Sequence, residues 1–221
     1  MRWPTITHAN GSLKILTMGD SLTQGSPPPE HRHGNPGQYQ WFMYGALRSA
    51  GIETDIWNLG IGGQRVGQIV DRIGSALPAD VVTVMGGTND VWHFAAAMVG
   101  FENEIVENIL DEHTRGINIV RSNPGCKHTC VILCSIPPMG NVKTLTKAMF
   151  DTVNNANVEI KALCKKEGAV FCDVNKAMRG DEVNKYARPE LVLPDGVHFT
   201  EAGNKACGEA IAKCIAAAVK K

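Results

Sequence analysis

The sequence carries no excess charge of either sign, since Lys plus Arg and Asp plus Glu are equal at 22 each in 221 residues. Nucleic-acid binders usually carry a net positive charge, and attraction to an anionic membrane surface depends on clustered Lys and Arg. The sequence also has no apolar run of the roughly 18 residues that a membrane-spanning helix needs. These absences argue against a nucleic-acid partner and against a membrane span, and they leave the oligomeric state open.

A signal peptide is also missing, because residues 1–12 lack the apolar core of such a leader. Two locations stay open: a cytoplasmic protein, or a secreted protein whose leader has been removed. The seven cysteines slightly favour the cytoplasm, since an odd number does not suit a disulfide framework.

No Cys-x-x-Cys pair occurs, which argues against a zinc ribbon. Cys134, Cys172 and Cys214 stand in apolar runs, where a buried thiol behaves as a small hydrophobic group. We therefore expect reduced thiols. A disulfide between Cys126 and Cys130 is the alternative.

No repeat, low-complexity tract or linker divides the chain, so a single domain over residues 1–221 is expected. Instead, strand-like and helix-like segments alternate along its whole length. Apolar runs predict strands over 13–18, 54–59, 79–85, 129–136 and 169–172. Helical spacing predicts helices over 38–49, 66–73, 105–110 with a broken continuation to 120, 153–163, and 202–218 with a Thr200 cap.

This alternation predicts an α/β protein: a three-layer α/β/α sandwich around a mainly parallel five-stranded sheet. Right-handed crossovers bring the carboxyl ends of all strands to one edge, where ligands bind in such folds. Polar motifs should therefore follow the strands.

Four polar motifs stand at the expected places. Gly19-Asp20-Ser21-Leu22 ends the first predicted strand, the segment 58–63 ends the second, and the segment 86–90 ends the third. The segment 194–198 lies just before the last helix. We expect all four at one rim of the sheet.

A serine hydroxyl becomes a good nucleophile when a base takes its proton and a third group orients that base. Ser21 has a candidate base in His198, and Asp195, three residues earlier, can orient the imidazole. The backbone N–H of Ser21, a glycine N–H of the second motif and the Asn89 side chain can stabilise an oxyanion. Asp20 is expected to shape the turn.

In order and spacing, the four motifs resemble the four blocks of the SGNH (GDSL) hydrolases. The resemblance runs from Gly19 to His198 and implies a flavodoxin-like α/β/α fold. It also implies a Ser21–His198–Asp195 triad, an oxyanion hole of Ser21, Gly63 and Asn89, and neither a metal nor a cofactor.

The second block leaves two questions open. The family pattern favours Gly63 over Gly60 or Gly62 as the oxyanion donor, because its glycine falls at the end of the block. The block continues with Gln64-Arg65, where relatives often carry Asp-Thr or Ser-Thr. Arg65 either contacts the leaving group or pairs with a carboxylate.

The remaining histidines are less informative. The spacing of His31 and His33 suggests a metal site, but a solvated loop is favoured because no other ligands stand nearby. His93 either lines the pocket or has a helix-capping or surface role, and His113 and His128 are expected at the surface.

Two further groups are expected in structural roles. Tyr39, Trp41 and Phe42 are expected to pack in the core, with one of them as a possible pocket wall. The acidic residues within 102–112 are expected on a solvated helix face.

The predicted reaction is acyl transfer from a small-molecule ester through an acyl-enzyme. A long loop over 23–36, without an apolar lid helix, favours short-acyl esters such as acetylated carbohydrates or aryl esters. The resemblance also allows lysophospholipid and thioester substrates. A non-catalytic carbohydrate-binding protein on this fold is the alternative from another class.

Overall fold

Five parallel strands form one sheet in the order β2-β1-β3-β4-β5. The computed structural model describes residues 11–26, 34–94, 100–180 and 185–219. The strands are β1 (Leu13–Gly19), β2 (Thr54–Gly60), β3 (Val81–Met85), β4 (Cys130–Cys134) and β5 (Val170–Cys172). The five predicted strands are confirmed, with their ends shifted by at most two residues.

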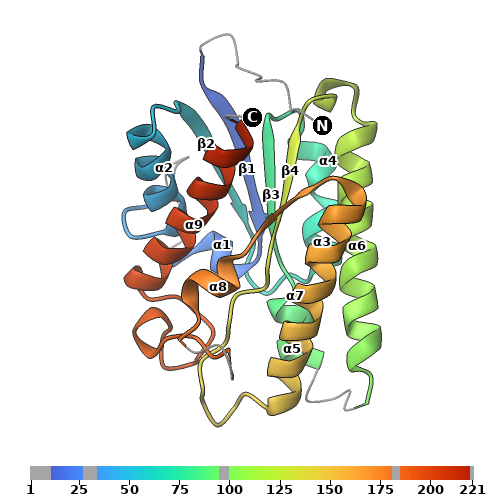
Figure 1. The fold of residues 1–221 in the computed structure, drawn as a ribbon, viewed down its shortest axis with the longest axis vertical. Helices are drawn as coiled ribbons and strands as arrows, with labels where there is room; N and C mark the ends of the chain where they lie inside the picture. Colours follow the sequence, from blue (N-terminus) through green and yellow to red (C-terminus); the bar gives the residue numbers. More distant parts are fainter. Residues whose placement is uncertain (1–10, 27–33, 95–99, 181–184, 220–221) are drawn as a thin grey trace.

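The strand order contains one switch point. Strand β1 pairs with β2 on one side, where Leu13 faces Thr54, and with β3 on the other, where Ile15 faces Val81. The chain thus runs from the central strand β1 to the edge strand β2, and then crosses back over β1 to form β3 on its other side (Figure 1). Ligands of open α/β sheets bind outside the carboxyl ends of the strands at such a point.

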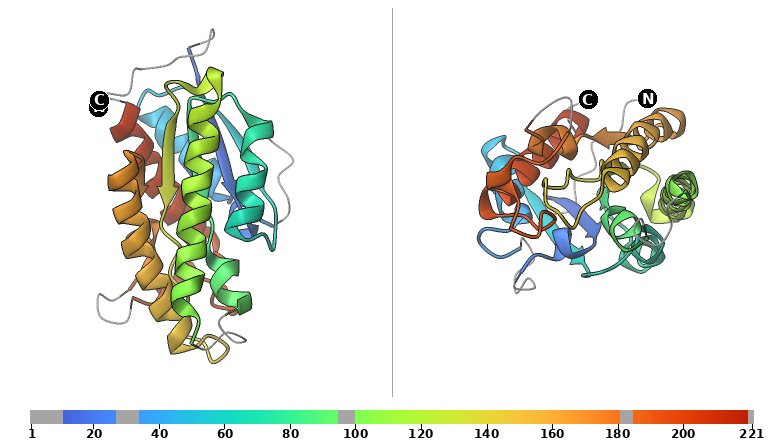
Figure 2. Two further views of the ribbon diagram at one scale, coloured as in Figure 1. Left: turned by 90° about the vertical axis from the view of Figure 1, so that its right-hand side faces the viewer. Right: turned by 90° about the horizontal axis from the view of Figure 1, so that it is seen from below.

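Helices cover both faces of the sheet. They are α1 (Ser21–Gln24), α2 (Tyr39–Ser49), α3 (Val66–Asp71), α4 (Ile73–Ala76), α5 (Thr88–Phe94), α6 (Glu102–Ser122), α7 (Lys147–Glu167), α8 (Val174–Met178) and α9 (Glu201–Val219), with 3₁₀ turns at Pro124–Cys126 and Pro189–Leu191. Helices α2 and α9 pack on one face, and α3, α6 and α7 pack on the other (Figure 2). The three-layer prediction is confirmed.

Helices α2 and α9 approach closely at Gly208. A β-carbon at Gly208 would lie 2.3 Å from the backbone oxygen of Tyr39, so only glycine allows this contact. Tyr39, Met43 and Leu47 form the buried stripe of α2 at helical spacing. Trp41 points away from that stripe and is 44% exposed, so its predicted core position is wrong.

Helix α6 corrects two predictions. It is continuous rather than broken, and Gly116 lies against α3, where a β-carbon would be 3.2 Å from Val70 Cγ2. His113 is fully buried instead of at the surface. It stands one turn from both Ile109 and Ile117, on the face that packs into the core. The predicted helix over 66–73, in contrast, is divided into α3 and α4.

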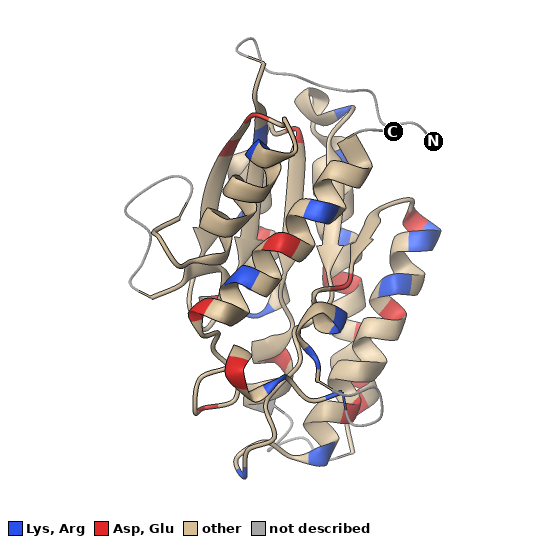
Figure 3. Ribbon diagram, turned by 60° about the vertical axis from the view of Figure 1, so that its left-hand side comes forward, with Lys and Arg blue, Asp and Glu red and all other residues tan. Residues whose placement is uncertain are grey.

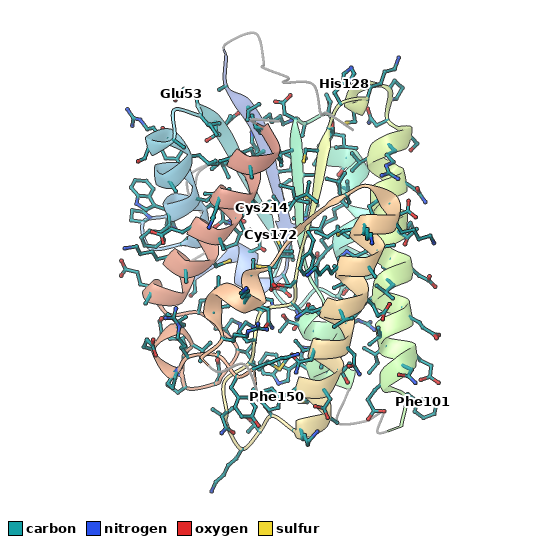
Figure 4. The ribbon with its side chains drawn as sticks, in the orientation of Figure 1. Glu53, Phe101, His128, Phe150, Cys172 and Cys214 are labelled. Carbon is teal, nitrogen blue, oxygen red and sulfur yellow. The ribbon has the colours of Figure 1, made fainter. Side chains whose placement is uncertain are left out.

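The seven cysteines are all free, so Cys126 and Cys130 form no disulfide. Figure 4 labels Cys172 of β5 and Cys214 of α9, which lie side by side. Cys172 is buried as predicted, whereas Cys214 is only half-buried. The same figure labels His128, which is exposed as predicted.

Charged residues of both signs are interspersed over the helices (Figure 3). Along α9, for example, Glu201, Lys205, Glu209 and Lys213 alternate in sign. The acidic residues of α6 are exposed or half-buried, as predicted. Within the described ranges, no helix combines the length and apolar character that crossing a membrane takes.

Candidate active site

Ser21 stands at the first position of α1, directly beyond the end of β1. The turn is narrow, because a β-carbon at Gly19 would lie 2.0 Å from Thr23 Oγ1. The Asp20 side chain caps α1 by accepting a hydrogen bond of 2.9 Å from the Leu22 N–H. The prediction that Asp20 shapes the turn is confirmed. The turn leaves Ser21 half-exposed at the rim of the sheet.

The Asp20 carboxyl group is buried and titrates unusually. Burial raises its pKa from 3.8 to about 7, and the nearby charge of Asp90 adds to this, while the Leu22 N–H opposes it. Its second oxygen lies 3.4 Å from Asn89 Nδ2. Asp20 thus connects the serine turn to the beginning of α5.

His198 and Asp195 come from the loop before α9. The loop is closed at its base, where the Leu193 N–H donates to the His198 oxygen at 2.7 Å. One Asp195 oxygen accepts from the backbone N–H groups of Val197 at 2.8 Å and His198 at 2.9 Å. Burial opposes ionisation of Asp195, but these bonds and His198 outweigh it and lower the pKa.

The three side chains form one hydrogen-bonded line. The second Asp195 oxygen lies 2.7 Å from His198 Nδ1, and His198 Nε2 lies 3.1 Å from Ser21 Oγ. The structure therefore brings together residues that are 177 positions apart in sequence. An imidazole held in this way presents its free nitrogen to a serine hydroxyl, the geometry of a nucleophile with its base.

The glycine loop after β2 uses most of its N–H groups within the protein. The Gly60 N–H donates to Asn58 Oδ1 at 3.0 Å, and the Gly62 N–H donates to Gln24 Oε1 at 2.9 Å. Gly63 adopts φ +77°, which favours glycine, and its N–H meets no acceptor within the described part of the chain. Of the three glycines, Gly63 has the available donor.

Asn89 is the second residue of α5, which follows β3, and its side chain is buried. Its Nδ2 donates to the backbone oxygen of Gln64 at 2.9 Å, in addition to the longer contact with Asp20. The strong bond fixes the amide plane, while the longer contact leaves the second N–H weakly held. Asn89 therefore lies between the glycine loop and the serine turn.

An open cavity of about 810 Å³ lies beside Ser21 and His198. Polar side chains from three segments line much of it: Gln24, Asn35, Gln38, Glu201 and Asn204. The expected loop over 23–36 does border the site, through the parts of it that the structure describes. Residues 27–33, including His31 and His33, lie outside the described residues. Among those described, no group of three His, Cys, Asp or Glu residues is placed to hold a metal ion.

Sequence reasoning missed Trp92, whose ring meets the His198 ring edge-on at 6.2 Å. The signal was its position three residues after Asn89, one turn along α5. The exposed His93 stacks on Trp92 at 5.5 Å, which supports the surface alternative for His93. For Arg65, one observation favours the alternative in which it pairs with a carboxylate. Burial raises the pKa of Asp90, and the nearby charge of Arg65 partly opposes that rise.

A parallel sheet whose carboxyl edge carries hydrogen-bonded Ser, His and Asp side chains is the arrangement of SGNH-type hydrolases. The sequence matches the GDSL-like Lipase/Acylhydrolase family over residues 17–206, most of the chain. The chain belongs to this family of carboxylic ester hydrolases. No curated protein sequence gives a match.

Several solved structures are similar in fold. An acetylxylan esterase from Geobacillus stearothermophilus is 23% identical, with a TM-score of 0.71 and 96% of each chain covered. The aryl esterase of M. smegmatis is 20% identical, with a TM-score of 0.67, covering 92% of this chain and 98% of its own. A carbohydrate acetylesterase from Sinorhizobium meliloti is 19% identical, with a TM-score of 0.68, covering 93% of this chain and 99% of its own.

Proposed function

We propose that the protein is a serine esterase in which Ser21 is the nucleophile, His198 the general base and Asp195 the residue that orients it. The observation that carries this proposal is the line of hydrogen bonds at 2.7 Å and 3.1 Å from Asp195 through His198 to Ser21. The depressed pKa of Asp195 supports it, because an ionised carboxylate stabilises the imidazolium that forms during the reaction.

The proposed oxyanion hole consists of the backbone N–H groups of Ser21 and Gly63 and the side chain of Asn89. Ser21 is the first residue of a helix, where an N–H has no partner within the helix. Gly63 is supported over Gly60 and Gly62 because its N–H alone among the three has no acceptor in the described part of the chain. Asn89 has a second N–H to offer, since its contact with Asp20 is long at 3.4 Å.

In the proposed reaction, Ser21 Oγ forms a bond to the ester carbonyl carbon while its proton passes to His198 Nε2. The carbonyl oxygen becomes an oxyanion at the three donors. The bond to the alcohol oxygen then breaks, and His198 returns the proton to that oxygen. Water attacks the acyl-enzyme with His198 again as base, which releases the acid and restores the Ser21 hydroxyl.

Short-acyl esters, either acetylated carbohydrates or aryl esters, are the proposed substrates. Two of the structural neighbours named above act on acetylated carbohydrate and one is an aryl esterase. The polar side chains among those that line the cavity provide hydrogen-bonding groups for a hydroxylated alcohol. Lysophospholipase and thioesterase activity remain the alternatives within the family, and carbohydrate binding without catalysis is the alternative outside it.

The test combines fluorophosphonate labelling with a panel of acetyl-sugars, aryl esters, thioesters and lysophospholipids. We expect labelling and short-ester hydrolysis in the wild type, and loss of both in Ser21→Ala and His198→Ala. Ser49→Ala is the matched control, because that hydroxyl is exposed on α2 and donates only to Gly45 O at 2.8 Å. Undiminished hydrolysis by Ser21→Ala contradicts the assignment, and a wild type that never labels favours the binding protein.

An acyl-chain series tests the substrate class separately. Each added CH₂ that enters an apolar acyl pocket contributes about 0.8 kcal/mol. We expect no such gain beyond short chains. Preference for chains above about ten carbons would show a long acyl pocket and refute the short-acyl proposal.

A further inference from the structure

Arg72 connects the carboxyl ends of β1 and β2 to the glycine loop through hydrogen bonds. It lies between α3 and α4, and its half-buried guanidinium makes three hydrogen bonds to backbone and side-chain oxygens. Nη1 donates to the Leu59 oxygen at 2.8 Å, Nη2 donates to the Gly19 oxygen at 3.3 Å, and Nε donates to Gln64 Oε1 at 2.9 Å. The three acceptors of the guanidinium lie at the end of β1 and in the segment 59–64, which contains the glycine loop.

Each of these acceptors lies within four residues of a proposed oxyanion donor along the chain. Gly19 is two residues before Ser21, and its oxygen also accepts the Ile61 N–H at 3.0 Å. Gln64 follows Gly63, and its backbone oxygen accepts the Asn89 side chain at 2.9 Å. The guanidinium therefore holds both ends of the loop that carries the Gly63 N–H and supports the residue that fixes Asn89.

We propose that Arg72 is a positioning residue that sets the geometry of the oxyanion hole, an inference that rests on the proposed esterase function. It touches no reacting atom. A guanidinium presents its donors in a rigid plane, so it can fix three oxygens at once, which an ammonium group cannot do with the same geometry. Charge-assisted bonds of this kind are also stronger than neutral ones.

The effect on catalysis follows from the precision that oxyanion stabilisation needs. Loss of one oxyanion donor lowers kcat by about 10²-fold to 10³-fold, and a displacement of about 1 Å can cost about 10²-fold. Removing Arg72 relaxes the loop without removing any donor. We therefore expect Arg72→Met to lower kcat by about 10-fold to 100-fold, with KM changed by less than about 3-fold, since the ground-state ester does not depend on these donors.

The experiment compares Arg72→Met and Arg72→Lys with a matched control, Arg115→Met. Arg115 also carries a guanidinium that reaches α3, where it donates to the Gly67 oxygen at 3.1 Å and pairs with Asp71 at 2.8 Å. Within the described part of the chain its guanidinium makes no hydrogen bond to the glycine loop, so its replacement reports the general cost of losing a guanidinium in this region. Kinetics with p-nitrophenyl acetate, thermal melting, and the inhibition constant of a trifluoromethyl ketone are measured for each protein.

A trifluoromethyl ketone separates positioning from simple support of the fold, because Ser21 converts it to a tetrahedral oxyanion. We expect its inhibition constant to rise in Arg72→Met by the same factor as kcat/KM falls. Adding methylguanidine should restore part of the lost kcat/KM in Arg72→Met. The Arg72→Lys substitution should restore none of it. Arg115→Met should keep the wild-type values. Gln64→Ala removes only the acceptor of Arg72 Nε, so it should show a smaller effect in the same direction. This variant replaces Arg72→Met in the experiment if Arg72→Met does not fold.

Three results overturn the inference. They are a folded Arg72→Met enzyme with unchanged kcat, an inhibition constant that does not follow kcat/KM, or an equal loss in Arg115→Met. Failure of the proposed function looks different, because the wild type itself would then neither hydrolyse esters nor label with a fluorophosphonate.

Discussion

His113 provides a prediction about stability that is independent of the active site. Its side chain is fully buried in the core face of α6, and neither ring nitrogen has a hydrogen-bond partner in the described part of the chain. Burial lowers its pKa from 6.5 to about 4. The imidazole therefore stays neutral in the folded protein at pH values at which the same side chain binds a proton in the unfolded chain.

The sign and size of the effect follow from this difference. Between pH 6.5 and about 4 the unfolded state holds one more proton at this site, so folding stability falls as the pH falls. Over the whole window the loss amounts to about 3 kcal/mol, and about 2 kcal/mol of it has occurred by pH 5. Above pH 7 only the cost of the two unpartnered ring nitrogens remains, about 1–3 kcal/mol for each.

The perturbation is His113→Met, which keeps a similar volume in a helix and removes both the proton and the polar atoms. Urea denaturation of wild type and variant from pH 4.5 to pH 8 gives the stability difference at each pH, in which all other titrating groups cancel. We expect the variant to be more stable at pH 8 and its advantage to grow by about 2 kcal/mol at pH 5. A difference that stays constant with pH would refute the reasoning.

Two further predictions concern the serine turn and the α2–α9 contact. Asp20→Asn should stabilise the protein at pH 8 by about 4 kcal/mol and have little effect at pH 4, because burial raises the Asp20 pKa to about 7 and its ionisation then opposes folding above pH 4. Denaturation at both pH values tests this, and equal effects would contradict it. Gly208→Ala should cost about 2 kcal/mol or more and lower Tm by about 4 °C or more, since its β-carbon meets the Tyr39 backbone at 2.3 Å. An unchanged Tm would show that α9 can shift away freely.

Much of the fold follows from the sequence because the parallel sheet is buried on both faces. Each strand is then a short, nearly continuous apolar run, and the glycine or polar residues that follow it mark its carboxyl end. The four motifs needed no long-range information to be placed at one rim, since parallel strands bring those ends together. Ser21 and His198, far apart in the chain, can therefore be paired from the sequence alone.

The errors have a common physical origin. The burial of His113 and of Trp41 depends on which helix face each residue occupies. His113 continues the Ile109 and Ile117 stripe at i ± 4, and Trp41 lies off the stripe of Tyr39 in α2. The break predicted in α6 is absent, and at Gly116 the missing side chain lets α6 approach α3. Only the tertiary contact with α3 supplies that information.

The choice among the glycines of the second motif required the structure for a different reason. The direction of a backbone N–H depends on which acceptors other segments bring to it, and no local pattern records them. Asn58 occupies the Gly60 N–H, and Gln24, from the helix that Ser21 begins, occupies the Gly62 N–H. With these two groups satisfied, the Gly63 N–H is the one of the three that remains available, which supports its place in the proposed oxyanion hole. The same reasoning applies to Arg72, whose guanidinium lies where three oxygens from two segments converge. In the proposed enzyme, a loop that presents one N–H to the oxyanion gains most from such a fixed support.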